Sequence, residues 1–372
     1  MKITKLESIF VKPRWHFLKM YTDEGLIGYG EPIVEGRART VAMAIKEMES
    51  YLIGEDPRKI EHHWQVLYRG TFYRGGPILV SAISGIEQAM WDITGKWLGV
   101  PVYQLLGGQV RDRIRVYAHS YGKTTREFIE DAKVKVKQGY TALKTSFDGP
   151  VRIIDTEEFL ENCVEKIDAI RKEIPKNVDI AIDLHGRFSP AMAIKLAKLL
   201  EPYGILFLEE PCLPENVDAM VTIARSTTIP IATGERLFTR WGFREVLEKQ
   251  AAAVLQPDIC HCGGILEAKK IAAMAEVYYA AVAPHNPLGP ISLAAGLQVD
   301  ACIPNFLCQE QVHLGEGYIK EPFVVKDGYI DIPKKPGLGI ELDEEALQNK
   351  MDDSSWDTPR WFHKDDGSFG EW

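Results

Sequence analysis

Acidic residues and histidines follow short apolar runs at regular intervals in the second half of the sequence. The residues that end these runs are Asp183, Glu209, Glu235, Asp258, His285 and Glu310. Successive members lie between 23 residues (235 to 258) and 27 residues (258 to 285) apart, about the length of one strand plus one helix. Any one of them alone could be a helix N-cap. Their recurrence over consecutive units predicts that the side chains meet in one site.

The carboxylates of Asp183, Glu209 and Glu235 indicate a metal site, because clustered carboxylates repel one another unless a cation holds them together. A set of hard oxygen donors is typical of Mg²⁺, with Mn²⁺ as the second choice. Zn²⁺ is disfavoured, since its sites usually include His or Cys ligands. The triplet at residues 260–262, Cys-His-Cys, lacks a second ligand pair. We expect it to be a buried or loop segment instead.

The two histidines could serve as base and acid. His285 follows Asp258 by one unit, and an aspartate beside a histidine fixes its tautomer and raises its basicity, which suits a general base. His185 lies two residues after Asp183 and points the same way if the strand pattern continues. Each histidine alone would be interpreted as a hydrogen-bonded loop residue. Their placement after the third and seventh strands predicts an acid and a base on opposite faces of a substrate.

The elements that must position these residues change character along the chain. Residues 1–113 combine β-like runs with helical periodicity over 41–52 and 80–98, which predicts a small α+β domain. From about residue 114, short apolar runs alternate with amphipathic stretches. The expected strands are 115–118, 142–145, 180–184, 205–208, 230–232, 253–255, 280–283 and 305–308. This alternation predicts a (β/α) barrel with its site at the carboxyl ends of the strands; the alternative is an open doubly wound sheet.

The composition restricts the class of protein. The chain has 372 residues and a formal charge of −9, from 53 Asp and Glu against 44 Lys and Arg. A protein that coats nucleic acid needs a basic face, so no nucleic-acid partner is expected. The sequence lacks an apolar leader and any run of about 18 apolar residues, so we expect a cytoplasmic protein with no membrane partner.

The motifs around these residues resemble the mandelate racemase subgroup of the enolase superfamily. They are Asp183-Leu184-His185-Gly186-Arg187, Glu209-Glu210-Pro211, Gly234-Glu235-Arg236, Gln256-Pro257-Asp258 and Ala283-Pro284-His285. The resemblance covers essentially the whole chain. It implies an α/β fold, a (β/α)7β TIM-like barrel with an α+β N-terminal capping domain completed by the C-terminal tail. The implied domains are the capping domain at 1–113, the catalytic barrel at 114–318, and a segment at 319–372 that packs back on the capping domain.

The resemblance also implies the role of each site residue. Mg²⁺ would bind Asp183, Glu209 and Glu235. His285 would be the base, oriented by Asp258, and His185 would be the acid. Glu310 would hydrogen-bond the substrate carboxylate and steady the intermediate. Lys144 is expected to contact the same carboxylate, the alternative being an exposed lysine at a strand end.

The implied reaction is dehydration of a six-carbon sugar acid, an aldonate, to a 2-keto-3-deoxy acid. D-galactonate is the first candidate substrate. The alternatives are another aldonate or an aldarate, with gluconate as an example, or a catalytically silent sugar-acid-binding protein on the same scaffold. Many relatives carry Lys-x-Lys after the second strand, where the second lysine is a base; Ser146 replaces it here. Racemisation by two opposed bases is therefore not expected. Because galactonate-specific members are associated with Asn at this position, Ser146 leaves the particular sugar acid open.

Three residues of the first domain are predicted to contact the substrate. Arg14 lies at the tip of the first hairpin, and Tyr73 and Arg74 lead into a glycine-rich loop. Both segments could close over a polyol chain. The alternative, given equal weight, is that both are surface turns without a role in binding. Trp356 and Trp361 are expected to anchor the tail. We also expect a homo-oligomer.

Overall fold

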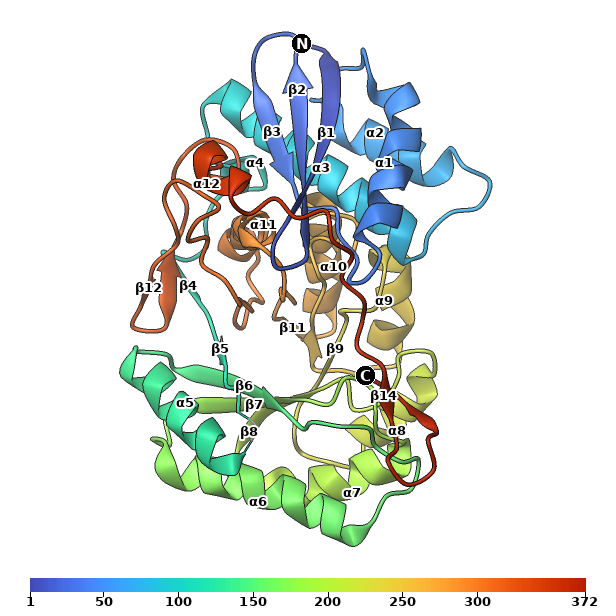
Figure 1. The fold of residues 1–372 in the computed structure, drawn as a ribbon, viewed down its shortest axis with the longest axis vertical. Helices are drawn as coiled ribbons and strands as arrows, with labels where there is room; N and C mark the ends of the chain where they lie inside the picture. Colours follow the sequence, from blue (N-terminus) through green and yellow to red (C-terminus); the bar gives the residue numbers. More distant parts are fainter. Residues whose placement is uncertain (123) are drawn as a thin grey trace.

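The computed structural model describes residues 1–122 and 124–372. A barrel forms the larger part of the described chain, and an α+β cap lies above it (Figure 1). The cap contains an antiparallel sheet in the order β1-β2-β3. Its elements are β1 (Ile3–Val11), β2 (Trp15–Thr22), β3 (Ile27–Gly30), α1 (Ala38–Leu52), α2 (Ile60–Arg69) and α3 (Pro77–Leu98). The predicted small α+β domain is therefore present.

Strand β3 packs directly on helix α3. A Cβ atom added at Gly28 would lie 2.1 Å from the Ala89 carbonyl oxygen, and one added at Gly30 would lie 1.9 Å from that of Gly85. Only glycine permits this approach of two backbones. The contact fixes α3 against the sheet, and the opposite side of α3 reaches the barrel.

The barrel is built on a parallel sheet in the order β5-β6-β7-β8-β9-β10-β11. Its strands are β5 (Ala118–His119), β6 (Ala142–Ser146), β7 (Asp179–Asp183), β8 (Ile205–Glu209), β9 (Ile231–Thr233), β10 (Val254–Leu255) and β11 (Ala281–Val282). Residues 306–309 close it, because Phe306 pairs with Val282 and Gln309 pairs with Val116, both in parallel. This closure excludes the open doubly wound sheet.

Small side chains fill much of the barrel interior. A buried cluster takes residues from all around the closed sheet, and Tyr117 and Phe207 are its large members, with ring centroids 6.5 Å apart. The cluster consists of Tyr117, Ala142, Ala181, Phe207, Ala232, Val254, Ala283 and Cys308. The barrel is thus a packed core, and the room for chemistry lies at its mouth.

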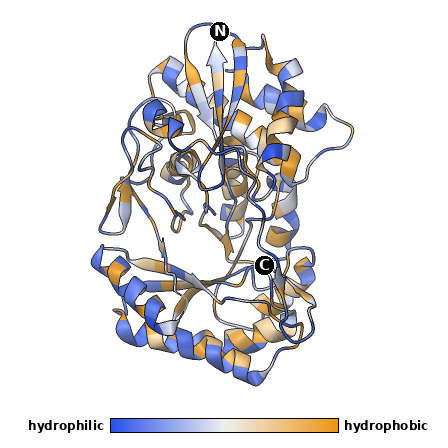
Figure 2. Ribbon diagram, in the orientation of Figure 1, coloured by the Kyte–Doolittle hydropathy of each residue, from blue (hydrophilic) through white to orange (hydrophobic). Residues whose placement is uncertain are grey.

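Amphipathic helices surround the barrel. In α6, Leu160, Cys163, Ile167 and Ile170 recur at helical spacing and are buried, and Figure 2 shows hydrophilic and hydrophobic residues alternating along this helix. The helices are α4 (Val102–Leu105), α5 (Thr125–Lys137), α6 (Glu157–Glu173), α7 (Pro190–Leu200), the 3₁₀ turn η1 (Glu201–Tyr203), α8 (Val217–Ala224), α9 (Thr239–Glu248), α10 (Ile265–Val277) and α11 (Pro290–Cys302).

The predicted strand at residues 115–118 is divided between two sheets. Strand β4 (Arg113–Arg115) pairs with β13 (Tyr329–Asp331), which also pairs with β12 (Val325–Lys326). In the barrel, Val116 pairs with Gln309 and β5 pairs with β6. The predicted first barrel strand is therefore confirmed from Val116 onward, while its first residue, Arg115, also belongs to the separate sheet of β4.

The tail after residue 340 touches both parts of the molecule. It contains α12 (Glu344–Gln348), β14 (Trp361–Phe362) and β15 (Phe369–Gly370). On the cap, the Asp352 amide donates to the Phe10 carbonyl (3.0 Å), and Lys19 pairs with Glu344. On the barrel, the Arg187 guanidinium lies 5.1 Å from the Trp361 ring centroid. In the described residues we find no helix whose length and apolar character would let it cross a membrane.

Candidate active site

The acidic residues predicted to bind metal meet at the carboxyl ends of three neighbouring strands. Asp183 ends β7 and Glu209 ends β8, and the two are paired in register. Glu235 follows β9 by two residues. One carboxylate oxygen from each of the three lies within 4.8 Å of the others. The Oε2 atom of Glu235 is buried and accepts no hydrogen bond from the described residues.

Lys144 lies within this group of carboxylates. Its Nζ donates to both oxygens of Glu209 at 3.0 Å and lies 2.8 Å from Glu310 Oε1 and 3.4 Å from Asp183 Oδ2. The side chain is 2% exposed, so Lys144 is not the exposed lysine of the alternative interpretation. Burial opposes its charge, but Glu209 and Glu310 raise the pKa of Lys144 well above its ordinary value. The lysine therefore supplies one fixed positive charge to an otherwise acidic site.

The carboxylates carry opposite pKa shifts. Burial, and then the charge of Asp183, raises the pKa of Glu209 well above its ordinary value. Burial acts in the same direction on Asp183, but His185 and Lys144 hold its pKa below the ordinary value. Burial likewise opposes the charge of Glu310, yet Lys144 and His285 hold the pKa of Glu310 well below its usual range. The site contains more negative charge than its lysine and histidines balance, which favours binding of a cation.

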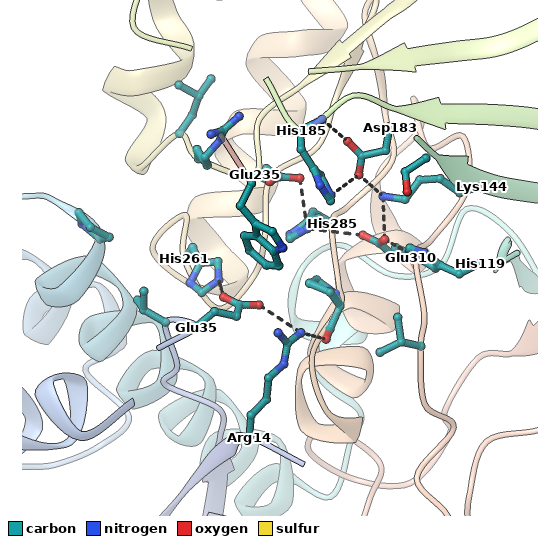
Figure 3. Close-up of a pocket in the computed structure, with 18 of the residues that line it drawn as sticks. Arg14, Glu35, His119, Lys144, Asp183, His185, Glu235, His261, His285 and Glu310 are labelled. Carbon is teal, nitrogen blue, oxygen red and sulfur yellow. Dashed lines mark hydrogen bonds and ion pairs between the residues drawn. The ribbon is translucent and has the colours of Figure 1, made fainter. Parts of the chain in front are cut away.

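His285 and Asp258 form a hydrogen-bonded pair. Nδ1 of His285 donates to Asp258 Oδ2 at 2.8 Å, and Asp258 is fully buried. This bond orients the ring so that Nε2 faces the carboxylates, 3.3 Å from Glu235 Oε2 and 3.8 Å from Glu310 Oε2 (Figure 3). Burial disfavours the charged ring, but Glu235, Glu310 and Asp258 raise the pKa of His285 well above its ordinary value. The ring therefore has a high affinity for a proton at Nε2, while Asp258 holds the proton at Nδ1.

His185 reaches the site through a turn. Strand β7 ends at Asp183, and His185 adopts φ 50°, in the left-handed region that is rare outside glycine. Its amide donates to Asp183 Oδ1 (2.9 Å), and its Nε2 lies 3.0 Å from Asp183 Oδ2. His185 therefore points to the same side as Asp183, as predicted. The turn after β7, and not the alternation of side chains along a strand, orients its ring. The charge of Asp183 raises the pKa of His185, so the ring tends to hold a proton.

A cavity of about 950 Å³ joins these groups to the cap. Its lining includes Arg14, which donates to the Pro287 carbonyl (3.2 Å) and lies 3.6 Å from Glu35. His261 lies on the other side of Glu35, with its Nε2 atom 3.8 Å from Glu35 Oε2. Figure 3 shows Arg14, Glu35 and His261 across the cavity from Asp183 and Lys144. The cysteines on either side of His261 are fully buried.

Among the lining residues that were not predicted as site residues are His119, Glu35 and Trp372. His119 Nε2 donates to Glu310 Oε1 at 2.6 Å. The sequence pattern could have indicated His119, because this residue directly follows the predicted strand at 115–118. Glu35 carries no such signal, because only the docking of the cap brings it here, and the docking of the tail brings Trp372.

The structure does not bring Tyr73 and Arg74 to the site. The glycine-rich loop between α2 and α3 points outward, Tyr73 is 84% exposed, and the Arg74 guanidinium lies over the Tyr68 ring at 5.9 Å. Pro77, at the start of α3, lines the cavity where these two residues do not. The contact of this pair with the substrate therefore stays a prediction from the sequence.

Two family signatures together span most of the chain. Residues 127–346 match the family described as "Enolase C-terminal domain-like". Residues 10–107 match the N-terminal domain of the mandelate racemase / muconate lactonizing enzyme family. The two matches correspond to the barrel side and the cap side of the cavity.

Relatives and solved structures agree with these signatures over the full length. A protein from Ralstonia nicotianae named D-galactonate dehydratase is 47% identical over the whole of both chains, and one from Cronobacter sakazakii with the same name is 48% identical. The structure of a mandelate racemase/muconate lactonizing enzyme from a Sulfitobacter species superposes with a TM-score of 0.90 at 35% identity, covering 96% of this chain and 99% of that one. One from a Jannaschia species gives 0.91 at 33% identity, covering 95% and 98%.

Proposed function

Because this chain belongs to the enolase superfamily, in its mandelate racemase subgroup, we propose that it is a Mg²⁺-dependent D-galactonate dehydratase. The products are 2-dehydro-3-deoxy-D-galactonate and water. The observation that carries the proposal is the placement of two histidines, His285 with Asp258 and His185 with Asp183, at one cavity beside the acidic cluster. The name shared by relatives that are 47% and 48% identical over their full length supports this choice of substrate.

Asp183, Glu209 and Glu235 fit a magnesium ion. Their oxygens lie within 4.8 Å of one another, and Glu235 Oε2 is buried without a hydrogen bond, as a metal ligand would be before its ion binds. When bound, the ion supplies positive charge that stabilises the negative charge developing on the substrate carboxylate. Lys144 adds a second positive charge, and we propose that its Nζ also contacts that carboxylate. We propose that Glu310 hydrogen-bonds the substrate carboxylate through a proton on its own carboxyl group, which it would take up when Lys144 leaves it to contact the substrate.

His285 is the proposed base. Since its Nδ1 proton is bound to Asp258, Nε2 is the atom that accepts the proton from C2 of the sugar acid. The electron pair of the broken C–H bond moves into the C1–C2 region, next to the carboxylate. His185 is the proposed acid. It gives its proton to the C3 hydroxyl as the C3–O bond breaks, which releases water and leaves an enol. The enol tautomerises to the 2-keto-3-deoxy acid, and exchange with solvent returns both histidines to their starting states.

Ser146 supports elimination over racemisation. It ends β6 and lines the cavity, in the place where many relatives carry a second basic lysine. Its backbone carbonyl accepts a hydrogen bond from Lys166 (2.8 Å). A proton can thus be removed by His285 on one face, with no lysine from this strand position to deliver one on the other. The Arg14 guanidinium, at the cap side of the cavity, is the proposed contact for the distal hydroxyls.

A panel of aldonates and aldarates, assayed for 2-keto-3-deoxy products with and without MgCl₂, tests the proposal. We expect product from D-galactonate that disappears when EDTA removes the metal. Turnover of another acid such as D-gluconate, without turnover of D-galactonate, would replace the substrate and keep the reaction. Binding of sugar acids without any product would favour the silent binding protein.

A further inference from the structure

Trp372 lies in the candidate active site, beside the proposed acid. Its ring centroid is 5.9 Å from that of His185, with 36° between the ring planes, and the residue lines the 950 Å³ cavity. In Figure 1 this end of the chain lies between the cap and the barrel. No part of the mechanism above uses Trp372.

The hairpin before Trp372 is fitted closely to the loop after β6. Strands β14 and β15 pair Trp361 with Gly370. A Cβ added at Gly370 would lie 2.3 Å from Pro150 Cβ, so the hairpin rests on Pro150 at a distance that only glycine allows. Gly370 is two residues before Trp372, and its contact therefore restricts where the indole can lie.

Charged and aromatic contacts hold the same hairpin on the barrel. Arg152 pairs with Asp365 (2.6 Å) and with Asp366 (3.1 Å) in the turn between β14 and β15. The Arg187 guanidinium, from the loop after β7, stacks over Trp361. The loops after β6 and β7, the strands that carry Lys144 and Asp183, thus hold the segment that presents Trp372.

A second indole connects Trp372 to the cap. The rings of Trp356 and Trp372 lie 6.4 Å apart at 60°, an edge-to-face contact. The Arg14 guanidinium lies 4.7 Å from the Trp356 ring centroid. Arg14, Trp356, Trp372 and His185 therefore form a continuous wall of contacts from the cap to the barrel, in which Arg14, Trp372 and His185 line the cavity and Trp356 does not.

We propose that Trp372 forms the part of this wall that contacts the substrate next to His185, and that it positions the sugar-acid carbon chain for loss of the C3 hydroxyl. The proposal rests on the proposed function. An indole is rigid and offers a large apolar face, so it can pack against the C–H side of an extended polyol and exclude water from the acid. Because small errors in position reduce rates strongly, Trp372 is a positioning residue for elimination.

Two substitutions test this role, Trp372→Ala and Trp372→Phe. With D-galactonate and Mg²⁺, Trp372→Ala is expected to lower kcat/KM for dehydration by about 10- to 100-fold. Trp372→Phe keeps an aromatic face and should recover most of this loss. Exchange of the C2 proton with D₂O should fall less than dehydration, because His285 comes from a different strand than His185. Trp97→Ala, which removes an indole outside the cavity lining, is the matched control and should keep wild-type kinetics.

Fluorine NMR of protein labelled with 5-fluorotryptophan separates this proposal from the proposed function. The Trp372 signal is assigned by its loss in Trp372→Phe. We expect this signal to shift when D-galactonate and Mg²⁺ are added. If D-galactonate is not a substrate, a shift with D-gluconate still supports the role of Trp372 while the proposed substrate fails. Wild-type kinetics in Trp372→Ala, or a Trp372 signal that moves with neither acid, would overturn the proposal.

Discussion

The two histidines of the site differ in the carboxylate that each one contacts. His285 bonds through Nδ1 to Asp258, which is not in the metal-binding set, so its Nε2 stays available at the cavity. His185 contacts Asp183, one of the proposed metal ligands. The surrounding carboxylates raise the pKa of both rings, so the proposed roles of base and acid rest on the different positions of the two histidines.

Substitution of each histidine by asparagine should separate the two proton transfers. We expect His285→Asn to abolish both dehydration and exchange of the C2 proton with D₂O. His185→Asn should slow dehydration by about 10²- to 10⁴-fold, the usual contribution of a general acid, while exchange continues. Proton NMR in D₂O measures both rates in one sample. Exchange that persists in His285→Asn would show that another group removes the proton, and unchanged dehydration in His185→Asn would exclude it as the acid.

At the scale of elements, the cap depends on the close contact of β3 with α3. The strand carries glycine at positions 28 and 30, each facing a backbone carbonyl of the helix. Helix α3 is buried along most of its length and touches both the cap sheet and the barrel helix α10. A shift of α3 would therefore be transmitted to the cap side of the cavity.

The variant Gly30→Ala should destabilise the protein, because its methyl group would meet the Gly85 carbonyl at 1.9 Å. We expect the free energy of unfolding to fall by about 1–3 kcal/mol, as for other overpacked sites. Gly242→Ala in α9 is the matched control, since its nearest neighbouring atom lies at 3.8 Å. This control should gain about 0.5–1 kcal/mol from the better helix propensity of alanine. Urea unfolding compares the two, and equal effects of both substitutions would contradict this account of β3.

At the scale of the whole molecule, buried carboxylates of the cap complete the N-termini of barrel helices. Glu87 of α3 accepts hydrogen bonds from the Ile265 and Leu266 amides (2.8 and 2.9 Å) at the start of α10. Glu31, just after β3, accepts from the Gly289 and Ser292 amides (2.7 and 2.9 Å) at the start of α11. These contacts satisfy amides that have no partner within their own helix. Burial raises the pKa of Glu87 and of Glu31 to about 8, against the hydrogen bonds from these amides, which favour the charged form. The contacts fix the cap on the barrel and so define the cavity between them.

Removal of the Glu87 carboxylate should weaken this junction. Glu87→Ala leaves the Ile265 and Leu266 amides and the Trp91 indole N–H without their acceptor, and we expect it to lower the free energy of unfolding by about 3 kcal/mol. Glu61→Ala is the control, because Glu61 of α2 also reaches α10, through Lys270 at 2.6 Å, but is 46% exposed. An exposed ion pair contributes about 0–1 kcal/mol. Chemical unfolding of both variants measures the difference, and a loss in Glu87→Ala no larger than in Glu61→Ala would contradict the role of the buried contact.

Several features of the whole molecule remain predictions from the sequence. The homo-oligomeric state, the cytoplasmic location and the domain boundaries at residues 113 and 318 belong to this group. The boundary at residue 318 concerns the tail, which contacts the cap through Asp352 and the barrel through Trp361.

The sequence by itself determined the barrel and most of the acidic and histidine cluster. The reason is periodicity: in a parallel barrel all strands end on the same face, so the residue after each apolar run is placed by its own strand. This rule alone predicts that Asp183, Glu209 and Glu235 meet. It also predicts that His285 lies next to Asp258, because the two residues follow neighbouring strands.

The tertiary structure alone decided which groups from outside the strand ends join them. Trp372 reaches His185 because its hairpin docks on Pro150. Tyr73 and Arg74 had the expected residue types but lie on a loop that turns outward. Such contacts depend on how the cap, the tail and the barrel pack together, and no local pattern of residues encodes the distance between segments hundreds of residues apart.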